Sequence, residues 1–277
     1  MWYPKAIENL QAICKDVRAD IVKMTAAAGS GHPGGSLSSV ELLTALYFNV
    51  LNHRPEEPNW PDRDRFILSK GHVCPVLYSV MARTGYFPVE ELMTLRKFGS
   101  RLQGHPNVKA LPGLESSSGS LGQGLSIANG LALAAKLNNK SYRVYCLMGD
   151  GELQEGQIWE AAMTAPHYGL DNVCAIVDYN NLQIDGKCDE VMGINPLAKK
   201  WESFNWHVIE IDGHDLAQVL KAYEEAANHK EQPSVIIAHT TKGKGVSFME
   251  NVAGWHGKAP NKEELEKALQ EIYGGGI

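Results

Sequence analysis

The feature that most constrains the fold is a repeated alternation of short apolar runs with longer amphipathic segments. Five runs of four to six residues are rich in apolar side chains, and each is followed at once by glycine or polar residues. Their ranges are Arg65–Ser69, Arg143–Met148, Val173–Asp178, His207–Ile211 and Val235–Ala238. Continuous apolar runs of this length are typical of strands buried on both faces. The pattern predicts an α/β fold with a parallel β-sheet flanked by helices on both faces.

Helical spacing of apolar residues predicts the segments between the runs and at both ends. The clearest helices are expected over Ala6–Ala28, Leu37–Val50, Ile158–Tyr168 and the charged stretch Asn261–Tyr273. The sequence has no internal repeat, low-complexity tract or linker-like change of composition. We therefore expect residues 1–277 to form a single domain with a charged C-terminal helix at about 261–273.

Composition narrows the classes of function. The formal net charge is −6, so no basic excess indicates a nucleic-acid partner, and no apolar stretch approaches the length of a membrane span. The start of the chain lacks the apolar core of a signal peptide. Five cysteines without a C-x-x-C pair indicate neither a disulfide framework nor a structural zinc site. A reducing, cytoplasmic location is the expectation.

Two polar clusters after neighbouring runs indicate a site for a metal and a phosphate. The sequence G-D-G at 149–151 follows one run, and Asn180-Asn181 follows the next, with the 28 residues Glu152–Tyr179 between them. One β-α-β unit would bring both clusters to the same edge of the sheet. A carboxylate and an amide oxygen suit Mg²⁺ or Ca²⁺, and Gly151 leaves room for a phosphate. Either cluster alone is more often a turn, but the combination favours a ligand site.

These clusters resemble the thiamine-diphosphate signature, in which a little under thirty residues separate G-D-G from the asparagines. Four histidine motifs are similar to those of transketolase, in the same order: S-G-H-P-G at His32, L-S-K-G-H at His72, G-H-P at His105 and W-H-G-K at His256. The segments 118–124 (S-G-S-L-G-Q-G) and 62–66 (D-R-D-R-F) also resemble that family. The resemblance runs from about Ile7 to Pro260 and implies the family's diphosphate-binding module, the thiamine-diphosphate-binding fold.

The resemblance also implies roles for individual residues. The expected metal ligands are Asp150, Asn180 and the backbone carbonyl of Leu182. The expected contacts to thiamine diphosphate are His72, Gly119, Leu121, Gly151, Asn180, Ile184, Lys242 and His256. The expected catalytic residues are His32, His105 and His256, which would meet substrate hydroxyls, and Glu155, which matches a glutamate at the contact between paired active sites. For Glu155 a solvated position near a helix start is the alternative.

The remaining histidines carry no motif of similar specificity and are interpreted as structural. They are His53, His167, His207, His214, His229 and His239.

The same resemblance implies transfer of a two-carbon ketol unit from a ketose phosphate to an aldose phosphate. Complete transketolases resemble this sequence only in their first half or less. We therefore expect an α2β2 assembly with a separate C-terminal, pyrimidine-binding partner subunit.

Two alternatives remain open within the sequence. One is the α-subunit of another thiamine-diphosphate enzyme, of the 2-oxoacid dehydrogenase or deoxyxylulose-phosphate synthase type. The G-H-P motifs at His32 and His105, together with L-G-Q-G, disfavour it. The other is a catalytically silent homologue, which the presence of every expected ligand and histidine disfavours.

Overall fold

The computed structural model describes residues 4–274 of the chain. The two ends of the predicted 1–277 domain, including the first three residues of the start that was expected to lack a signal peptide, lie outside the described residues. Among the described helices none is both long and apolar enough to cross a membrane.

A five-stranded sheet forms the centre of the molecule, with the order β1-β2-β3-β7-β6. All of its neighbouring strands pair in parallel. The strands are β1 (Arg65–Leu68), β2 (Val144–Gly149), β3 (Val173–Tyr179), β6 (His207–Asp212) and β7 (Ser234–His239). Each of the five predicted runs is therefore a strand, and the predicted α/β class is confirmed.

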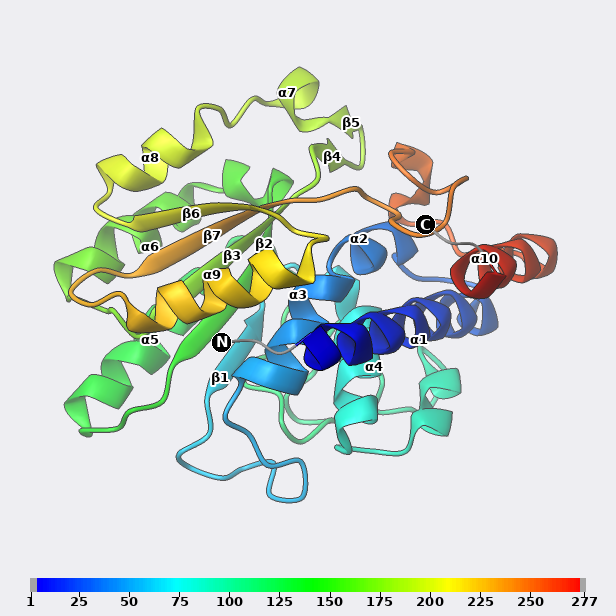
Figure 1. Cartoon of the computed structure of the whole chain (residues 1–277), viewed down its shortest axis with the longest axis horizontal. Helices are drawn as coiled ribbons and strands as arrows, with labels where there is room; N and C mark the ends of the chain where they lie inside the picture. Colours follow the sequence, from blue (N-terminus) through cyan, green and yellow to red (C-terminus); the bar gives the residue numbers. More distant parts are fainter. Residues whose placement is uncertain (1–3, 275–277) are drawn as a thin grey trace.

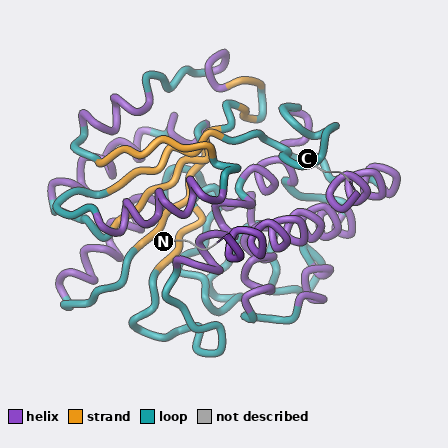
Figure 2. Tube along the Cα trace, viewed as in Figure 1, coloured by secondary structure: helices purple, strands orange, loops and turns teal. Residues whose placement is uncertain are grey.

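Helices cover both faces of this sheet, as Figures 1 and 2 show. Alternate side chains of β2 enter different cores: Tyr145 and Leu147 pack with α1, α3, α4 and α9, whereas Cys146 and Met148 pack with α5, α6 and α8. The helices of the first core are α1 (Pro4–Ala28), α2 (Pro33–Ser38), α3 (Val40–Ala45), α4 (Cys74–Thr84), α9 (Leu216–Asn228) and α10 (Lys262–Gly274). Those of the second are α5 (Gly124–Leu137), α6 (Gly156–His167) and α8 (Leu197–Ser203).

The prediction of one continuous helix over Leu37–Val50 was wrong. The chain turns at Ser39 between α2 and α3, and a π-helical turn, Leu46–Val50, follows α3. The hydroxyls of Ser38 and Ser39 both donate to the backbone carbonyl of Gly35 and to the carboxylate of Asp178. Hydroxyls that bond to nearby backbone compete with helical hydrogen bonding, and here a distant carboxylate fixes the break.

A small antiparallel hairpin and the last helix complete the fold. The hairpin, β4 (Leu182–Gln183) and β5 (Gly186–Lys187), leads into the short helix α7 (Cys188–Val191) and was not predicted. The predicted charged helix is α10, which lies alongside α1 in Figure 1. At its start Asn261 and Glu264 exchange reciprocal side-chain to backbone hydrogen bonds, which form a capping box. All five cysteines are buried free thiols.

Candidate active site

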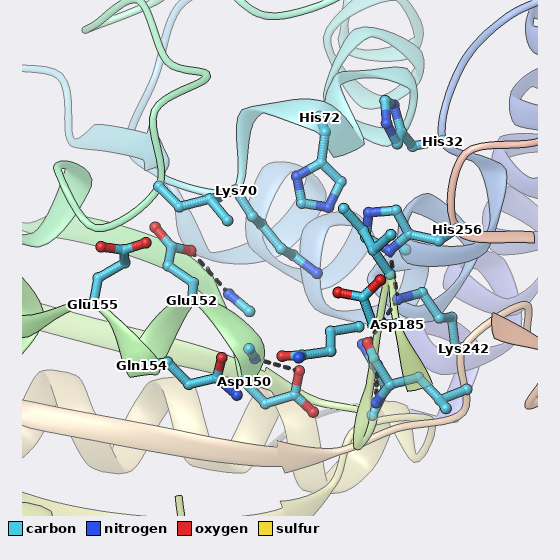
Figure 3. A pocket seen from close by; sticks show the side chains of 18 of the residues that line it. His32, Lys70, His72, Asp150, Glu152, Gln154, Glu155, Asp185, Lys242 and His256 are labelled. Atoms are coloured by element: carbon cyan, nitrogen blue, oxygen red, sulfur yellow. Dashed lines mark hydrogen bonds between the residues drawn. The ribbon is translucent and has the colours of Figure 1, made fainter. Parts of the chain in front are cut away.

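A cavity of about 360 Å³ lies at the carboxyl ends of β2, β3 and β7. This is the edge of a parallel sheet at which ligands bind in open α/β folds. The predicted site residues that line it are His32, His72, Gly119, Leu121, Asp150, Gly151, Glu155, Asn180, Leu182, Ile184, Lys242 and His256. Figure 3 shows several of these side chains directed into one space.

His105 is the one predicted site residue outside this lining. Its ring centroid is 6.3 Å from that of His32, and a Cβ atom on Gly119 would lie 3.5 Å from the His105 ring. It therefore stands behind the Gly119 loop, next to the cavity wall. The six histidines interpreted as structural are all absent from the lining.

Three oxygen groups converge where a metal was expected. The Asp150 side chain, only 2% exposed, accepts hydrogen bonds from the backbone N–H groups of Gly151 (2.7 Å) and Asn181. The side-chain oxygen of Asn180 accepts from the N–H of Leu182 at 3.1 Å. The Leu182 carbonyl faces the same cavity and accepts from the Lys242 amine at 2.7 Å.

This donor set fits a hard divalent cation that is shared with a phosphate. The described residues contain no cluster of three His, Cys, Asp or Glu that could hold a metal, so a cation here would rely on a carboxylate, a carboxamide and a backbone carbonyl. Such mixed oxygen donors suit Mg²⁺, which keeps room for phosphate oxygens and water. Burial, with the nearby charge of Asp178, raises the pKa of Asp150 to about 6. A bound cation would favour the ionised form.

Positive charge is held beside these oxygens. The Lys242 amine contacts Nδ1 of His256 at 2.9 Å as well as the Leu182 carbonyl. Burial lowers the pKa of Lys242 to about 8, although the carboxylate of Asp150 opposes this shift. Lys70, which also lines the cavity, is a second buried amine on the same wall. Two lysines in one polar cavity suit an anionic ligand such as a diphosphate.

Four histidines form a cluster on the other wall. The His32 centroid lies 5.2 Å from that of His72 and 5.5 Å from that of His256, and His72 and His256 are 5.1 Å apart. Burial first, and then neighbouring positive groups, lowers the pKa of His32 to about 4 and that of His256 to about 3. The pKa values of His72 and His105 are lowered for the same leading reason. All four rings are therefore neutral at pH 7 and can accept a proton.

The walls near the open side of the cavity carry the remaining predicted residues. Ile184, on the β4–β5 hairpin, is 71% exposed and offers an apolar surface opposite Gly119 and Leu121. Glu155 is exposed at the start of α6 and its side chain makes no capping hydrogen bond. Its stem packs against the Gly119–Gly124 loop, since a Cβ on Gly122 would lie 2.8 Å from the Cβ of Glu155.

Sequence reasoning missed a buried ionic network directly beneath the cavity. The Lys70 amine forms an ion pair with Asp178, a carboxylate with no exposed surface. That carboxylate also accepts from Ser38 at 2.5 Å, from Ser39 at 3.1 Å and from the Thr240 hydroxyl. Although burial alone would raise it, the charge of Lys70 and these donors hold the pKa of Asp178 below its usual value. The position of Lys70 within the L-S-K-G-H motif was the available signal.

Glu152 was also missed, although it follows G-D-G directly in the sequence. It lines the cavity while remaining 2% exposed.

Comparison with known proteins decides the family. Residues 9–275 match the family model described as transketolase, thiamine diphosphate binding domain. The chain belongs to the transketolase family.

Its relatives include proteins of two lengths. The first subunit of an apulose-4-phosphate transketolase from Phocaeicola vulgatus is 42% identical over 266 residues, which are 96% of this chain and 94% of that protein. The SqwG subunit of a 6-deoxy-6-sulfo-D-fructose transketolase from Clostridium sp. is 43% identical over 95% of this chain and 96% of its own length. Human transketolase is 42% identical over 96% of this chain, which spans only 42% of the human protein.

Solved transketolase structures share the fold of this transketolase domain. The transketolase of Campylobacter jejuni superposes with a TM-score of 0.90 at 35% sequence identity, over 95% of this chain and 42% of that one. A transketolase from Pichia stipitis superposes with a TM-score of 0.91 at 32% identity, over 95% of this chain and 40% of that one.

Proposed function

We propose that this chain is the diphosphate-binding subunit of a two-chain transketolase that moves a two-carbon ketol unit from a ketose phosphate to an aldose phosphate. The observation that supports this most is the convergence of Asp150, Asn180 and the Leu182 carbonyl beside the amine of Lys242. Residues 1–277 would form one domain in this proposal, and the free cysteines agree with a reducing, cytoplasmic location.

In this proposal the cavity holds thiamine diphosphate together with Mg²⁺ or Ca²⁺. Asp150, Asn180 and Leu182 would ligate the metal, and His72, Gly151, Lys242 and His256 would contact the diphosphate. The cofactor, when bound, supplies the electron sink for breaking the carbon–carbon bond beside a ketose carbonyl. Gly119, Leu121 and Ile184 would face its rings, and the exposed apolar surface of Ile184 supports that position.

The histidine cluster would handle the sugar. His32, His105 and His256 would meet substrate hydroxyls, with His32 and His256 moving a proton at the hydroxyl next to the cleaved bond. Their lowered pKa values support this role, since a neutral imidazole can take that proton at neutral pH. Glu155 would contact a second active site across the interface between chains, in keeping with its exposure and lack of a capping hydrogen bond.

A separate partner subunit completes the proposed enzyme. The relatives of similar length are named as subunits, whereas the human transketolase is more than twice as long. The partner would carry the pyrimidine-binding module, and two copies of each chain would form an α2β2 assembly with the cofactor between unlike chains. The printed substrates of the two shorter relatives differ, so the particular sugar phosphates are left to experiment.

Reconstitution tests this function. The chain is assayed alone and with its partner subunit for ketol transfer between sugar phosphates, with thiamine diphosphate and Mg²⁺ supplied. We expect turnover only from the mixture and loss of turnover after chelation of the metal. Efficient transfer by the chain alone would contradict the two-chain arrangement. Decarboxylation of a 2-oxoacid in place of ketol transfer would identify the other class of thiamine-diphosphate enzyme, and cofactor binding without either reaction would identify a silent homologue.

A further inference from the structure

Glu152 is a buried carboxylate that lines the cavity and has no part in the proposed ligand set. It follows Gly151 in a short 3₁₀ turn, Gly151–Gln154, at the end of β2. Among the described residues it has no ion-pair partner within 4 Å, so its charge is not balanced by a direct salt bridge. A buried carboxylate without a counter-ion is costly unless hydrogen bonds satisfy it. Its partners therefore need an explanation.

Three donors from three different segments meet on this carboxylate. One oxygen accepts from the hydroxyl of Ser69 and from the backbone N–H of Gly122 at 2.9 Å. The other oxygen accepts from the backbone N–H of Gly149 at 3.1 Å. Ser69 begins the segment that carries Lys70 and His72, Gly122 lies in the loop that carries Gly119 and Leu121, and Gly149 directly precedes Asp150.

These segments are packed with little spare space. The N–H of Gly124 donates to the Ser69 hydroxyl at 3.1 Å, and a Cβ atom on Gly124 would lie 2.4 Å from the Ser69 side chain. A Cβ on Gly71 would lie 2.5 Å from the hydroxyl of Ser118. The two loops therefore touch through glycine backbone, and the carboxylate of Glu152 joins their contact to the end of β2.

We propose that Glu152 is a positioning residue that fixes the Ser69–His72 segment, the Gly119–Gly124 loop and the Gly149–Gly151 turn relative to one another. Through this junction it sets the distance between the metal ligand Asp150 and the groups that face the diphosphate and the cofactor rings. The inference rests on the proposed function for the identity of the ligand, but the junction itself is a property of the chain alone. Supporting residues that orient ligands affect affinity about 10- to 100-fold when they are changed.

Electrostatics and geometry predict opposite outcomes for Glu152→Gln. Removal of a negative charge beside a diphosphate site would by charge alone strengthen diphosphate binding. Loss of an acceptor at the three-way junction would weaken it, because the amide group of glutamine directs N–H bonds at one of the three donors. The direction of the change in affinity therefore separates a positioning role from a simple effect of charge.

The test compares Glu152→Gln with Asp20→Asn. Asp20 is a matched control, since it is also buried and accepts three hydrogen bonds, from Ser79 at 2.7 Å and from Arg83 at 2.6 and 3.0 Å, away from the cavity. Backbone amide hydrogen exchange is measured on the full chain. We expect exchange at Gly122 and Gly149 to rise about tenfold or more in Glu152→Gln and to remain unchanged in Asp20→Asn.

Affinity for thiamine diphosphate with Mg²⁺ is then measured by calorimetry on the assembled enzyme. We expect it to fall about tenfold in Glu152→Gln, with kcat at saturating cofactor within about threefold of the wild-type value. Unchanged exchange at Gly122 and Gly149, or tighter cofactor binding, would overturn the positioning role. If Glu152→Gln does not fold, Ser69→Ala replaces it, and unchanged cofactor affinity in that variant has the same meaning. A wild-type chain that binds no thiamine diphosphate would overturn the proposed function, while the exchange result would still decide the junction.

Discussion

The carboxyl ends of β2 and β3 each carry a buried aspartate, and the two side chains have opposite surroundings. Asp178, on β3, accepts from Lys70, from the hydroxyls of Ser38, Ser39 and Thr240, and from the side-chain amide of Asn180. Asp150, which follows β2, accepts hydrogen bonds within the described part of the chain only from the backbone N–H groups of Gly151 and Asn181.

The difference separates a structural carboxylate from one that is available to a ligand. A carboxylate offers about four lone-pair positions, so the five donors around Asp178 leave no place for a cation. The two donors on Asp150 leave part of its capacity free, and its raised pKa reports a charge that the protein itself does not fully stabilise. Asp178 therefore neutralises Lys70 within the core, whereas Asp150 is available to a metal.

The largest effect is expected from breaking the saturated strand end. Asp178→Asn removes the partner of Lys70 and leaves a buried ammonium group without a counter-charge. We expect the free energy of unfolding to fall by about 3–5 kcal/mol, as measured by urea denaturation followed by circular dichroism. The double variant with Lys70→Met should recover much of this loss, because no buried charge then remains unpaired. A loss below about 1 kcal/mol in the single variant would contradict the assigned role of Asp178.

At the other strand end, the effect should fall on binding instead. Asp150→Asn keeps the size of the side chain but removes the charged metal ligand. We expect metal-dependent affinity for thiamine diphosphate to fall more than about 100-fold by calorimetry on the assembled enzyme. The free energy of unfolding of the chain should change by less than about 1 kcal/mol, since relief of charge burial offsets the loss of one acceptor. Unchanged affinity would remove Asp150 from the metal site.

The contrast between the two aspartates also marks what the sequence could reveal. The five strands were predictable because each is a short apolar run that stops at polar residues, and the position of Asp150 followed from a motif at a strand end. Asp178 ends a predicted strand as well, but nothing local distinguishes a saturated carboxylate from a free one. Its partners Lys70 and Ser38 are 108 and 140 residues away in the sequence.

The same limit explains the missed break at Ser39 and the missed junction at Glu152. Helical periodicity continues through Ser38 and Ser39, and only the distant Asp178 carboxylate gives their hydroxyls a second set of bonds. Glu152 bonds to Ser69, which is 83 residues away, so its role is decided by tertiary contact. The β4–β5 hairpin was missed because its strands have two residues each, too few for an alternating pattern.

A smaller effect is expected from removing one donor of the saturated end. Ser38→Ala deletes a 2.5 Å hydrogen bond to Asp178 inside the core. Hydrogen bonds to charged groups contribute about 1.5–3 kcal/mol, and we expect the lower figure because other donors remain. Thr44→Val is the matched control on α3, since the buried Thr44 hydroxyl has no hydrogen-bond partner within the part of the chain that the structure describes. Equal losses from both variants would show that the Asp178 bond adds nothing.

The smallest effect concerns the pH dependence of the free strand end. Asp150 has a folded-state pKa of about 6, which burial raises from the usual aspartate value of 3.8. Between these values the folded chain binds more protons at this position than the unfolded chain, so its contribution to stability increases as pH falls. We expect the wild-type chain, without metal, to gain about 1 kcal/mol relative to Asp150→Asn between about pH 6 and about pH 5, by urea denaturation. The difference between the two chains cancels the titration of the histidine cluster, which both share. A gain in the opposite direction would mean that Asp150 is already stabilised as an anion, and the contrast with Asp178 would then no longer hold.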